Sequence, residues 1–195
     1  MIFKSMTRIL LVWSTAGFVS VCQSVPDADV PRRSVATEVG DVANALSGEW
    51  SIEFTIRPNE ALPKGGTGHG KEVWKAGPGG LSLVEEYQSV GDDGDNTGLG
   101  IFWWEEKSHR FQVLWCANDE PDGCEAISDG AIWQNRQLVL VHRWESHGKQ
   151  SELREVFSEI TPSSFTQTIY RAEIPGAPNV AYVFHAKRKS GPSSS

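Results

Sequence analysis

From about residue 48 to residue 188, hydrophobic and polar positions alternate along the chain with a period of two. Trp50, Ile52 and Phe54, for example, are each followed by a polar residue. This pattern predicts a β-strand with one buried face, because successive side chains of a strand point to opposite faces. Further runs of this kind, bounded by turn residues, predict strands at about 70–76, 81–89, 99–106, 110–117, 124–133, 137–146, 151–160, 164–173 and 179–188, about ten in all.

The connections between these runs are short and rich in Gly, Pro, Asp and Ser, as at 77–80, 91–95 and 161–163. Short connections join sequential strands as antiparallel hairpins. An open sheet of this many strands would leave two unpaired edges, which closure into a barrel removes. The expected fold class is therefore all-β, an antiparallel up-and-down β-barrel of about ten strands. A barrel of this size encloses space for one small ligand.

A short N-terminal helix is expected before the strands. Val39, Val42 and Leu46 fall at i, i+3 and i+7, and the helix should end near residues 47–48. The expected organisation of the whole chain is a signal peptide over 1–24, a flexible leader over 25–37, a β-barrel domain over 38–189 and a disordered tail over 190–195.

The first 24 residues have the layout of a secretory signal peptide. Lys4 and Arg8 precede an apolar stretch, and small residues follow it up to Ser24. The apolar stretch is too short for an ordinary transmembrane helix. An uncleaved anchor or a core helix is one alternative, and a lipid anchor at Cys22 is another, although lipoprotein processing prefers a residue smaller than Val21 before the cysteine. We therefore expect an exported protein, periplasmic or extracellular, without a membrane span.

Composition and charge exclude several classes of partner. Hydrophobic content is 39% and charged content 22%, so a sizeable core can form. The formal net charge of −7 argues against nucleic acid and against an anionic membrane surface. P-loop, dinucleotide-binding and Gly-x-Ser-x-Gly signatures are absent from the sequence. We therefore expect no catalytic residues and no cofactor, and a small molecule is the expected partner.

The cysteines and histidines predict a structural bond rather than a metal site. Cys116 and Cys124 stand at the end of one expected strand and the start of the next, so they should form a disulfide in an oxidising compartment; two unpaired thiols are the alternative. The five histidines lack the i, i+2 or i, i+4 spacing of metal ligands. The acidic run at 92–95 lacks the spacing of a calcium loop, and an exposed hairpin turn is expected there.

Several motifs, taken in order, indicate a family. A Gly-x-Trp start at 48–50 follows the expected helix, as in lipocalins and other calycins. The next motifs are Gly-Gly-Leu-Ser-Leu-Val-Glu-Glu-Tyr (79–87), Gly-Leu-Gly-Ile-Phe-Trp-Trp-Glu (98–105), Phe-Gln-Val-Leu-Trp (111–115), Gly-Ala-Ile-Trp (130–133) and Leu-Val-Leu (138–140). This series resembles the bacterial lipocalin-like family catalogued as domain of unknown function 1579, over about 40–188. The resemblance implies a calycin-like barrel and no particular activity.

Charged and aromatic side chains on the expected strands are the candidates for contact with a ligand. Adjacent Glu85 and Glu86 point to opposite faces, so one of them should face the interior, where a buried Glu needs a partner such as an Arg. His142 shares a face with apolar neighbours, so a buried, hydrogen-bonded His is the first expectation. The full candidate set is Glu85, Glu86, Trp103, Trp115, His142, Arg143, Trp144 and Tyr170.

Three functional hypotheses follow from the expected barrel. The first is a carrier or sensor that binds a small, partly apolar molecule among the aromatic side chains of the interior. The second is an enzyme that acts on a small polar molecule in the cavity, through some of Glu85, Glu86, His142 and Arg143. The third is a structural or interaction domain whose Trp residues fill the interior. The presence of a cavity, and the charged groups that line it, discriminate among them.

Overall fold

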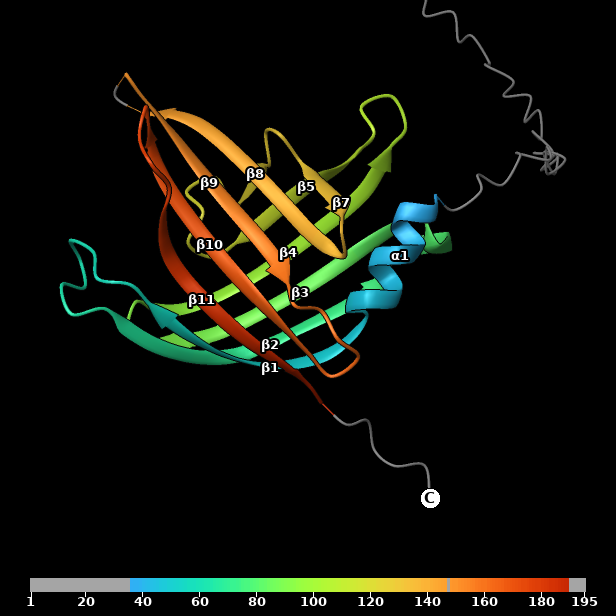
Figure 1. Cartoon of the computed structure of the whole chain (residues 1–195), viewed down its shortest axis with the longest axis horizontal. Helices are drawn as coiled ribbons and strands as arrows, with labels where there is room; N and C mark the ends of the chain where they lie inside the picture. Colours follow the sequence, from blue (N-terminus) through green and yellow to red (C-terminus); the bar gives the residue numbers. More distant parts are fainter. Residues whose placement is uncertain (1–35, 147, 190–195) are drawn as a thin grey trace, which may run out of the picture. The chain divides into compact units, whose positions relative to one another are not determined.

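Antiparallel β-strands form most of residues 36–189, the part of the chain that the computed structural model describes, apart from His147 (Figure 1). The expected signal peptide, the lipid-anchor candidate Cys22, nearly all of the expected leader and the expected tail lie outside these residues. The elements are α1 (Thr37–Leu46), β1 (Gly48–Ile56), β2 (Gly66–Ala76), the 3-10 turn η1 (Pro78–Gly80), β3 (Ser82–Gly91), β4 (Gly94–Glu105), β5 (Arg110–Ala117), β6 (Cys124–Ala126), β7 (Ala131–Gln134), β8 (Gln137–Ser146), β9 (Lys149–Ser158), β10 (Ser164–Ile174) and β11 (Asn179–Arg188).

The strands close into one antiparallel barrel. From β1 to β5 each strand pairs with the next, β5 meets β7, and pairing then continues in chain order to β11. The barrel closes where β11 pairs with β1. The short β6 pairs only with β5 and lies beside the closed ring. The expected up-and-down barrel of about ten strands is confirmed, with β6 as an additional short strand.

One face of each long strand is buried, as the alternating pattern predicts. Along β1, Trp50, Ile52, Phe54 and Ile56 are buried, and the residues between them are exposed. The same alternation on the other strands directs apolar side chains into a common core, so the core runs through the inside of the barrel.

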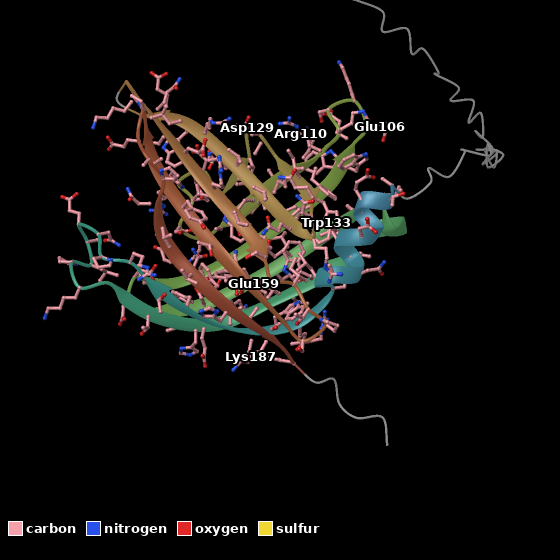
Figure 2. The ribbon with its side chains drawn as sticks, in the orientation of Figure 1. Glu106, Arg110, Asp129, Trp133, Glu159 and Lys187 are labelled. Carbon is pink, nitrogen blue, oxygen red and sulfur yellow. A yellow bond between two sulfur atoms is a disulfide. The ribbon has the colours of Figure 1, made fainter. Side chains whose placement is uncertain are left out.

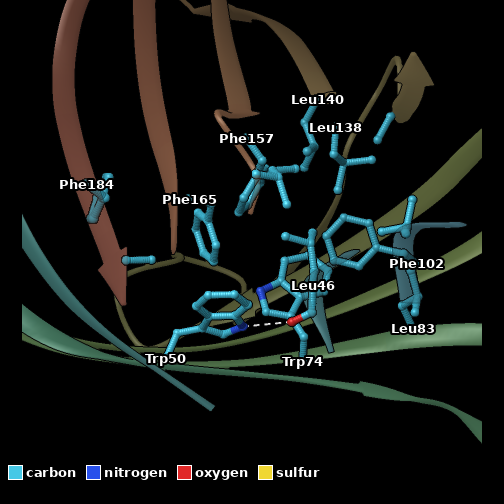
Figure 3. Packing of buried hydrophobic residues seen from close by; sticks show 14 of the residues in the cluster. Leu46, Trp50, Trp74, Leu83, Phe102, Leu138, Leu140, Phe157, Phe165 and Phe184 are labelled. Carbon is cyan, nitrogen blue, oxygen red and sulfur yellow. Dashed lines mark hydrogen bonds between the residues drawn. The ribbon is translucent and has the colours of Figure 1, made fainter. Parts of the chain in front are cut away.

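Helix α1 lies at one end of the barrel, against β2, β3 and β4 (Figure 1). Its buried residues are the three that the spacing predicts, Val39, Val42 and Leu46. The indole Nε1 of Trp50 donates a 2.7 Å hydrogen bond to the carbonyl oxygen of Leu46 (Figure 3). This bond satisfies one of the carbonyl groups that a helix C-terminus leaves free, and it fixes the helix to β1.

Two strand boundaries differ from the sequence prediction. Strand β2 begins at Gly66, before the expected residue 70, because glycine in this run accommodates a large neighbour. A Cβ atom at Gly68 would lie 2.1 Å from the ring of Phe54, so only glycine leaves room for that ring. The strand expected over 124–133 is two strands, β6 and β7, because the chain turns at Gly130, which has a φ of +63°.

Candidate functional site

A cavity of about 300 Å³ occupies the half of the barrel that is remote from α1. On β1 it is lined by Phe54 and not by Trp50, and on β9 by Glu155 and not by Phe157. The other half is filled with buried side chains, among them Trp50, Trp74 and Phe157 (Figure 3). The barrel therefore has a packed end at α1 and an open end with a cavity.

The cavity wall combines apolar surface with acidic groups. Its apolar lining consists of Phe54, Phe102, Val113, Trp115, Ile127, Leu140, Leu153, Ile169 and Phe184. Seven carboxylate side chains also line it, namely Glu85, Asp93, Asp95, Asp119, Glu120, Glu125 and Glu155. Arg171 and His142 are the basic side chains in this lining. The cavity is thus partly apolar and strongly acidic.

Glu85 comes from β3 and is almost completely buried. Its cross-strand partner on β4 is Gly100, and a Cβ atom there would approach the Glu85 carboxylate oxygen to 3.1 Å. Glycine at position 100 therefore makes room for this carboxylate inside the barrel. Burial raises the pKa of Glu85 well above its ordinary value, and the charges of Glu72 and Glu155 raise it further.

Glu72 comes from β2 and is 0% exposed. The indole Nε1 of Trp74 donates a 3.2 Å hydrogen bond to its Oε2, and its Oε1 has no partner. Burial raises the pKa of Glu72 to about 8, an effect that the Trp74 hydrogen bond opposes and the charge of Glu155 reinforces. Glu72 does not line the cavity itself, but its charge raises the pKa of two residues that do, Glu85 and Tyr87.

Glu155 comes from β9, on the opposite side of the ring of strands from Glu72 and Glu85. Its Oε1 accepts a hydrogen bond from the side-chain amide of Gln167 on β10. Burial raises the pKa of Glu155 to about 7, against the lowering effect of that hydrogen bond. The amide oxygen of Gln167 is buried and has no partner. We call Glu72, Glu85 and Glu155 the carboxylate cluster.

The carboxylate cluster contains no internal cation. The sequence led us to expect an Arg beside the inward-facing Glu, and this expectation is wrong. Arg143 and Arg154 instead lie on the outer surface and both contact Glu152. Burial stabilises the neutral form of each member; the charge of Glu155 adds to this effect at Glu72, and the charges of Glu72 and Glu155 add to it at Glu85.

His142 joins β8 to the segment between β6 and β7 at the mouth of the cavity. Its Nδ1 accepts a 3.2 Å hydrogen bond from the backbone N–H of Ser128, and its Nε2 lies 2.9 Å from the carboxylate of Glu125. Because Nδ1 accepts, the proton lies on Nε2 and is donated to Glu125. The expected hydrogen-bonded histidine is thus present, but its side chain is half-buried rather than buried, and it also lines the cavity.

The segment that leads from β6 into β7 is held from three further sides. The expected disulfide between Cys116 and Cys124 is present and links β5 to β6. Arg110 donates a 3.0 Å hydrogen bond to the backbone oxygen of Asp129, and both residues lie at the same part of the molecule in Figure 2. The Asp129 carboxylate also pairs with Arg143 at 3.1 Å. One wall of the mouth is therefore fixed to its neighbours.

Four of the eight candidate residues lie at or beside the cavity. Glu85, Trp115 and His142 line it, and Trp144 stacks on His142 with ring centroids 5.3 Å apart. Trp115 faces Gly98, where a Cβ atom would lie 2.3 Å from the indole ring. Glycine at that position therefore lets the ring lie flat against β4.

The other four candidate residues do not line the cavity. Glu86 pairs with Lys75 on the outer surface, where its side chain is 48% exposed. Trp103 is 42% exposed, and Arg143 forms its ion pairs outside the barrel. Tyr170 lies between two cavity-lining residues of β10, so strand alternation directs it away from the cavity. The structure offers no support for a role of these four in ligand contact.

Sequence reasoning missed three important members of the site, Glu72, Glu155 and Gln167. Glu155 stands between Leu153 and Phe157 on an otherwise apolar face, so the alternation of β9 contained a signal for it. Glu72 shares a face with Trp74 in the same way. Which strands bring these groups together depends on the register of the closed barrel, and no local pattern encodes that register.

Two negative findings apply to the described residues. Between 36 and 189, His147 aside, no group of three or more His, Cys, Asp or Glu side chains is arranged to hold a metal ion. In the same part of the chain, no helix has the length and apolar character needed to cross a membrane.

Comparisons with known proteins support the fold alone. No protein-family model and no curated protein matches the chain. Among solved structures, the barrel is similar to an S-type phycobiliprotein lyase from Guillardia theta, with 12% identity, 80% of this chain and 94% of that chain covered, and a TM-score of 0.50. A redesigned β-barrel, mFAP0, bound to DFHBI matches at 15% identity, 74% of this chain and 99% of that chain, and a TM-score of 0.38. The chain has the lipocalin-like β-barrel fold.

Proposed function

We propose that this chain is an exported member of the bacterial lipocalin-like family described above, and that it binds a small, partly apolar ligand in the open end of the barrel. The observation that carries this proposal is the cavity itself. About 300 Å³ lies within the range of small-molecule sites, and its wall combines aromatic and aliphatic surface with a few polar groups, as such sites do. A barrel whose only task was structural would gain stability by filling this space.

A fluorescence titration with N-phenyl-1-naphthylamine, a neutral probe that brightens in apolar surroundings, tests the binding proposal. We expect saturable binding with one site per chain. Ile169→Trp should weaken binding at least about tenfold, because the added ring fills the cavity that Ile169 lines. Ile132→Trp is the matched control, since Ile132 is an exposed apolar residue outside the cavity. Equal binding by both variants, or none by the unaltered protein, contradicts the proposal.

Export is supported by the signal-peptide pattern and by the disulfide. A bond between Cys116 and Cys124 is of the kind that persists in oxidising compartments. Mass spectrometry of the protein recovered from expressing bacterial cells tests this part. We expect a periplasmic or secreted chain that begins after Ser24, with both thiols of the pair oxidised. A full-length chain in the cytoplasm, with two free thiols, would count against export.

A second candidate function is a cavity-site enzyme that acts on a small polar molecule. The convergence of Glu85 and Glu155 on one cavity favours it, because buried carboxyl groups with raised pKa values can serve as general acids. Of the residues first considered for this role, Glu86 and Arg143 lie outside the barrel. Turnover of a polar substrate that Glu85→Gln abolishes, and Glu86→Gln leaves intact, would establish this function.

A further inference from the structure

Among the residues that the structure describes, none supplies a counter-charge to the carboxylate cluster, and this is the unusual feature of the cavity. Glu72 and Glu85 come from the neighbouring strands β2 and β3, Glu155 comes from β9 much later in the sequence, and the barrel brings the three together. A buried carboxylate is costly unless a cation or several donors compensate it. Here the donors are one indole N–H to Glu72 and one amide to Glu155. The cluster is therefore incomplete with respect to positive charge.

An unpartnered acceptor in the cavity wall independently indicates that a donor is missing there. Gln167 Oε1 is buried without a hydrogen-bond partner, and Gln167 is more than nine-tenths buried. Buried acceptors of this kind are rare in folded proteins and need an explanation. Gln167 lines the cavity, so its amide oxygen is available to a molecule bound there. A ligand that brings several N–H donors would satisfy it.

The mouth of the cavity is also acidic. Asp93, Asp95, Asp119, Glu120 and Glu125 line it, and Glu125 is paired there with His142. The single guanidinium in the lining, that of Arg171, lies 5.8 Å from the centre of the Tyr182 ring. A cleft lined mainly by one sign of charge concentrates ligands of the opposite sign. The entrance thus attracts cations and repels anions.

From these observations we infer that the ligand is a monocationic organic amine whose apolar body lies against the aromatic wall. Its ammonium group is placed among Glu85, Glu155 and the amide oxygen of Gln167. An ammonium group offers three donors and no acceptor, which matches this set of acceptors. The inference rests on the proposed binding function and names its ligand class. The shared recognition chemistry is a primary ammonium group on a body small enough for about 300 Å³.

The site should bind the amine more tightly as pH rises. In the free protein, burial raises the pKa of Glu155 to about 7 and that of Glu72 to about 8, so near neutrality Glu72 is mostly protonated and Glu155 is partly protonated. Deprotonation creates the negative charge that the ammonium group pairs with. The titratable and charged groups that face the site are Glu72 on β2, Glu85 and Tyr87 on β3, Asp93 in the β3–β4 turn, Asp95 on β4, Asp119 and Glu120 in the β5–β6 loop, Glu125 on β6, His142 on β8, Glu155 on β9, Arg171 on β10 and Tyr182 on β11.

Three probes with a phenyl ring on a four-carbon chain test the inference: 4-phenylbutylamine ends in a cation, 4-phenylbutanol in a neutral hydroxyl and 4-phenylbutyrate in an anion. Calorimetric titration of the full chain at pH 8 should show the amine binding at least about tenfold more tightly than the alcohol, and the carboxylate most weakly. Amine affinity should rise between pH 6 and pH 8.5, whereas alcohol affinity should stay level or fall. These measurements need no variant, so they hold even if a substitution impairs folding.

Charge-neutral variants then locate the ammonium group. Glu155→Gln should weaken amine binding about tenfold and leave alcohol binding unchanged, since it removes charge at nearly constant volume. Glu86→Gln is the matched control, because Glu86 lies on the outer surface and should change neither affinity. Glu85→Gln is a second variant with the same expectation as Glu155→Gln.

The outcomes separate this inference from the proposed function. If the alcohol or the carboxylate binds as tightly as the amine, the inference is overturned while binding in the cavity stands. If N-phenyl-1-naphthylamine binds and none of the three probes does, the inference is again overturned while binding in the cavity stands. If no probe binds at all, both the inference and the proposed function are overturned.

Discussion

The two ends of this barrel are built by the same strands with the same alternation of side chains, yet one end is filled with side chains and the other contains a cavity. At the end near α1, the inward positions carry large apolar side chains, including Trp50, Trp74 and Phe165, and they fill the interior (Figure 3). At the other end, the inward positions carry Glu85 and Glu155 among apolar and aromatic side chains such as Trp115, and a cavity remains. The difference shows that close packing of large side chains stabilises this barrel mainly at one end.

This difference between the two ends affects the stability of the fold. Close packing of aromatic side chains stabilises the packed end, whereas buried carboxylates and an unfilled cavity at the open end reduce stability. Functional sites commonly carry groups that the folded state would not choose for stability. Substitutions at the two ends should therefore differ in their effect on stability.

The largest effect should come from the packed end. Trp50→Ala should lower the free energy of unfolding by about 3–5 kcal/mol, because it removes a fully buried ring. The centroid of this ring lies 4.8 Å from that of Phe165, and its N–H donates a hydrogen bond to the carbonyl oxygen of Leu46. Trp115→Ala at the open end should cost about 1–2 kcal/mol, since this indole borders a cavity. Urea unfolding measures both. Equal losses in the two variants would remove the contrast between the ends.

The next effect concerns the pH dependence of stability. Glu72 has a pKa of about 8 in the folded protein against an ordinary value of 4.5, so the folded state binds the extra proton. Its contribution to stability is therefore complete below pH 4.5 and is lost as pH rises towards 8. Glu72→Gln should remove this loss and make the variant more stable than the unaltered protein at pH 8, by on the order of 3 kcal/mol.

Urea unfolding at pH 5 and at pH 8 checks the prediction for Glu72. The unaltered protein should be less stable at pH 8 than at pH 5, and the variant should show a smaller difference. Burial of Glu85 and Glu155 also raises their pKa values, so part of the slope should remain in the variant. A stability that increases from pH 5 to pH 8 in both proteins would contradict the account of the carboxylate cluster.

A smaller effect is expected from the disulfide at the mouth. The double variant Cys116→Ser/Cys124→Ser opens a link between residues 8 apart, which should cost about 2–3 kcal/mol on the chain-entropy model. Because β6 carries Glu125 at the mouth, the variant should also weaken ligand binding. Urea unfolding without reductant and a probe titration measure these losses. Unchanged stability and unchanged binding would show that the other contacts of this segment suffice.

The smallest effect should come from the outer surface. Glu86→Gln removes an exposed ion pair with Lys75, so the free energy of unfolding should change by under about 1 kcal/mol, and its pH dependence should be unaffected. Comparison with Glu85→Gln separates two adjacent glutamates by the face they occupy. A pH dependence altered as strongly by Glu86→Gln as by Glu85→Gln would mean that the assignment of faces is incorrect.

The sequence was sufficient to predict the barrel because its determinants are local. The alternation that begins at Trp50, the hairpin-length connections and the spacing of Val39, Val42 and Leu46 each specify one element within a short window. The pairing of Cys116 with Cys124 was predictable for the same reason. Gly66 and Gly68 misled the prediction for β2, since Gly68 accommodates the Phe54 ring and Gly66 lies close to Asp92, and neither ends the strand.

The carboxylate cluster was only partly predictable because it is not local. Glu85 could be found, since it neighbours Glu86 and one of the two had to face inward. Glu155 could have been found from its place between Leu153 and Phe157. That Glu72 and Glu155 act on the same cavity, however, depends on closure of β11 onto β1 and on the register of every strand between them. The expected Arg partner for the inward Glu is not found: Arg143 and Arg154 face outward, and Arg171 lines the cavity without an ion pair to Glu85.

Nuclear magnetic resonance of the indole N–H groups tests directly whether one end of the barrel is packed and the other binds a ligand. During titration with N-phenyl-1-naphthylamine, the signal of Trp115 should shift and saturate, because this indole lines the cavity. The signals of Trp50 and Trp74 should stay in place, because both rings are buried in the packed end. Shifts at Trp50 and Trp74 without one at Trp115, or no shift at saturating probe, would contradict the account.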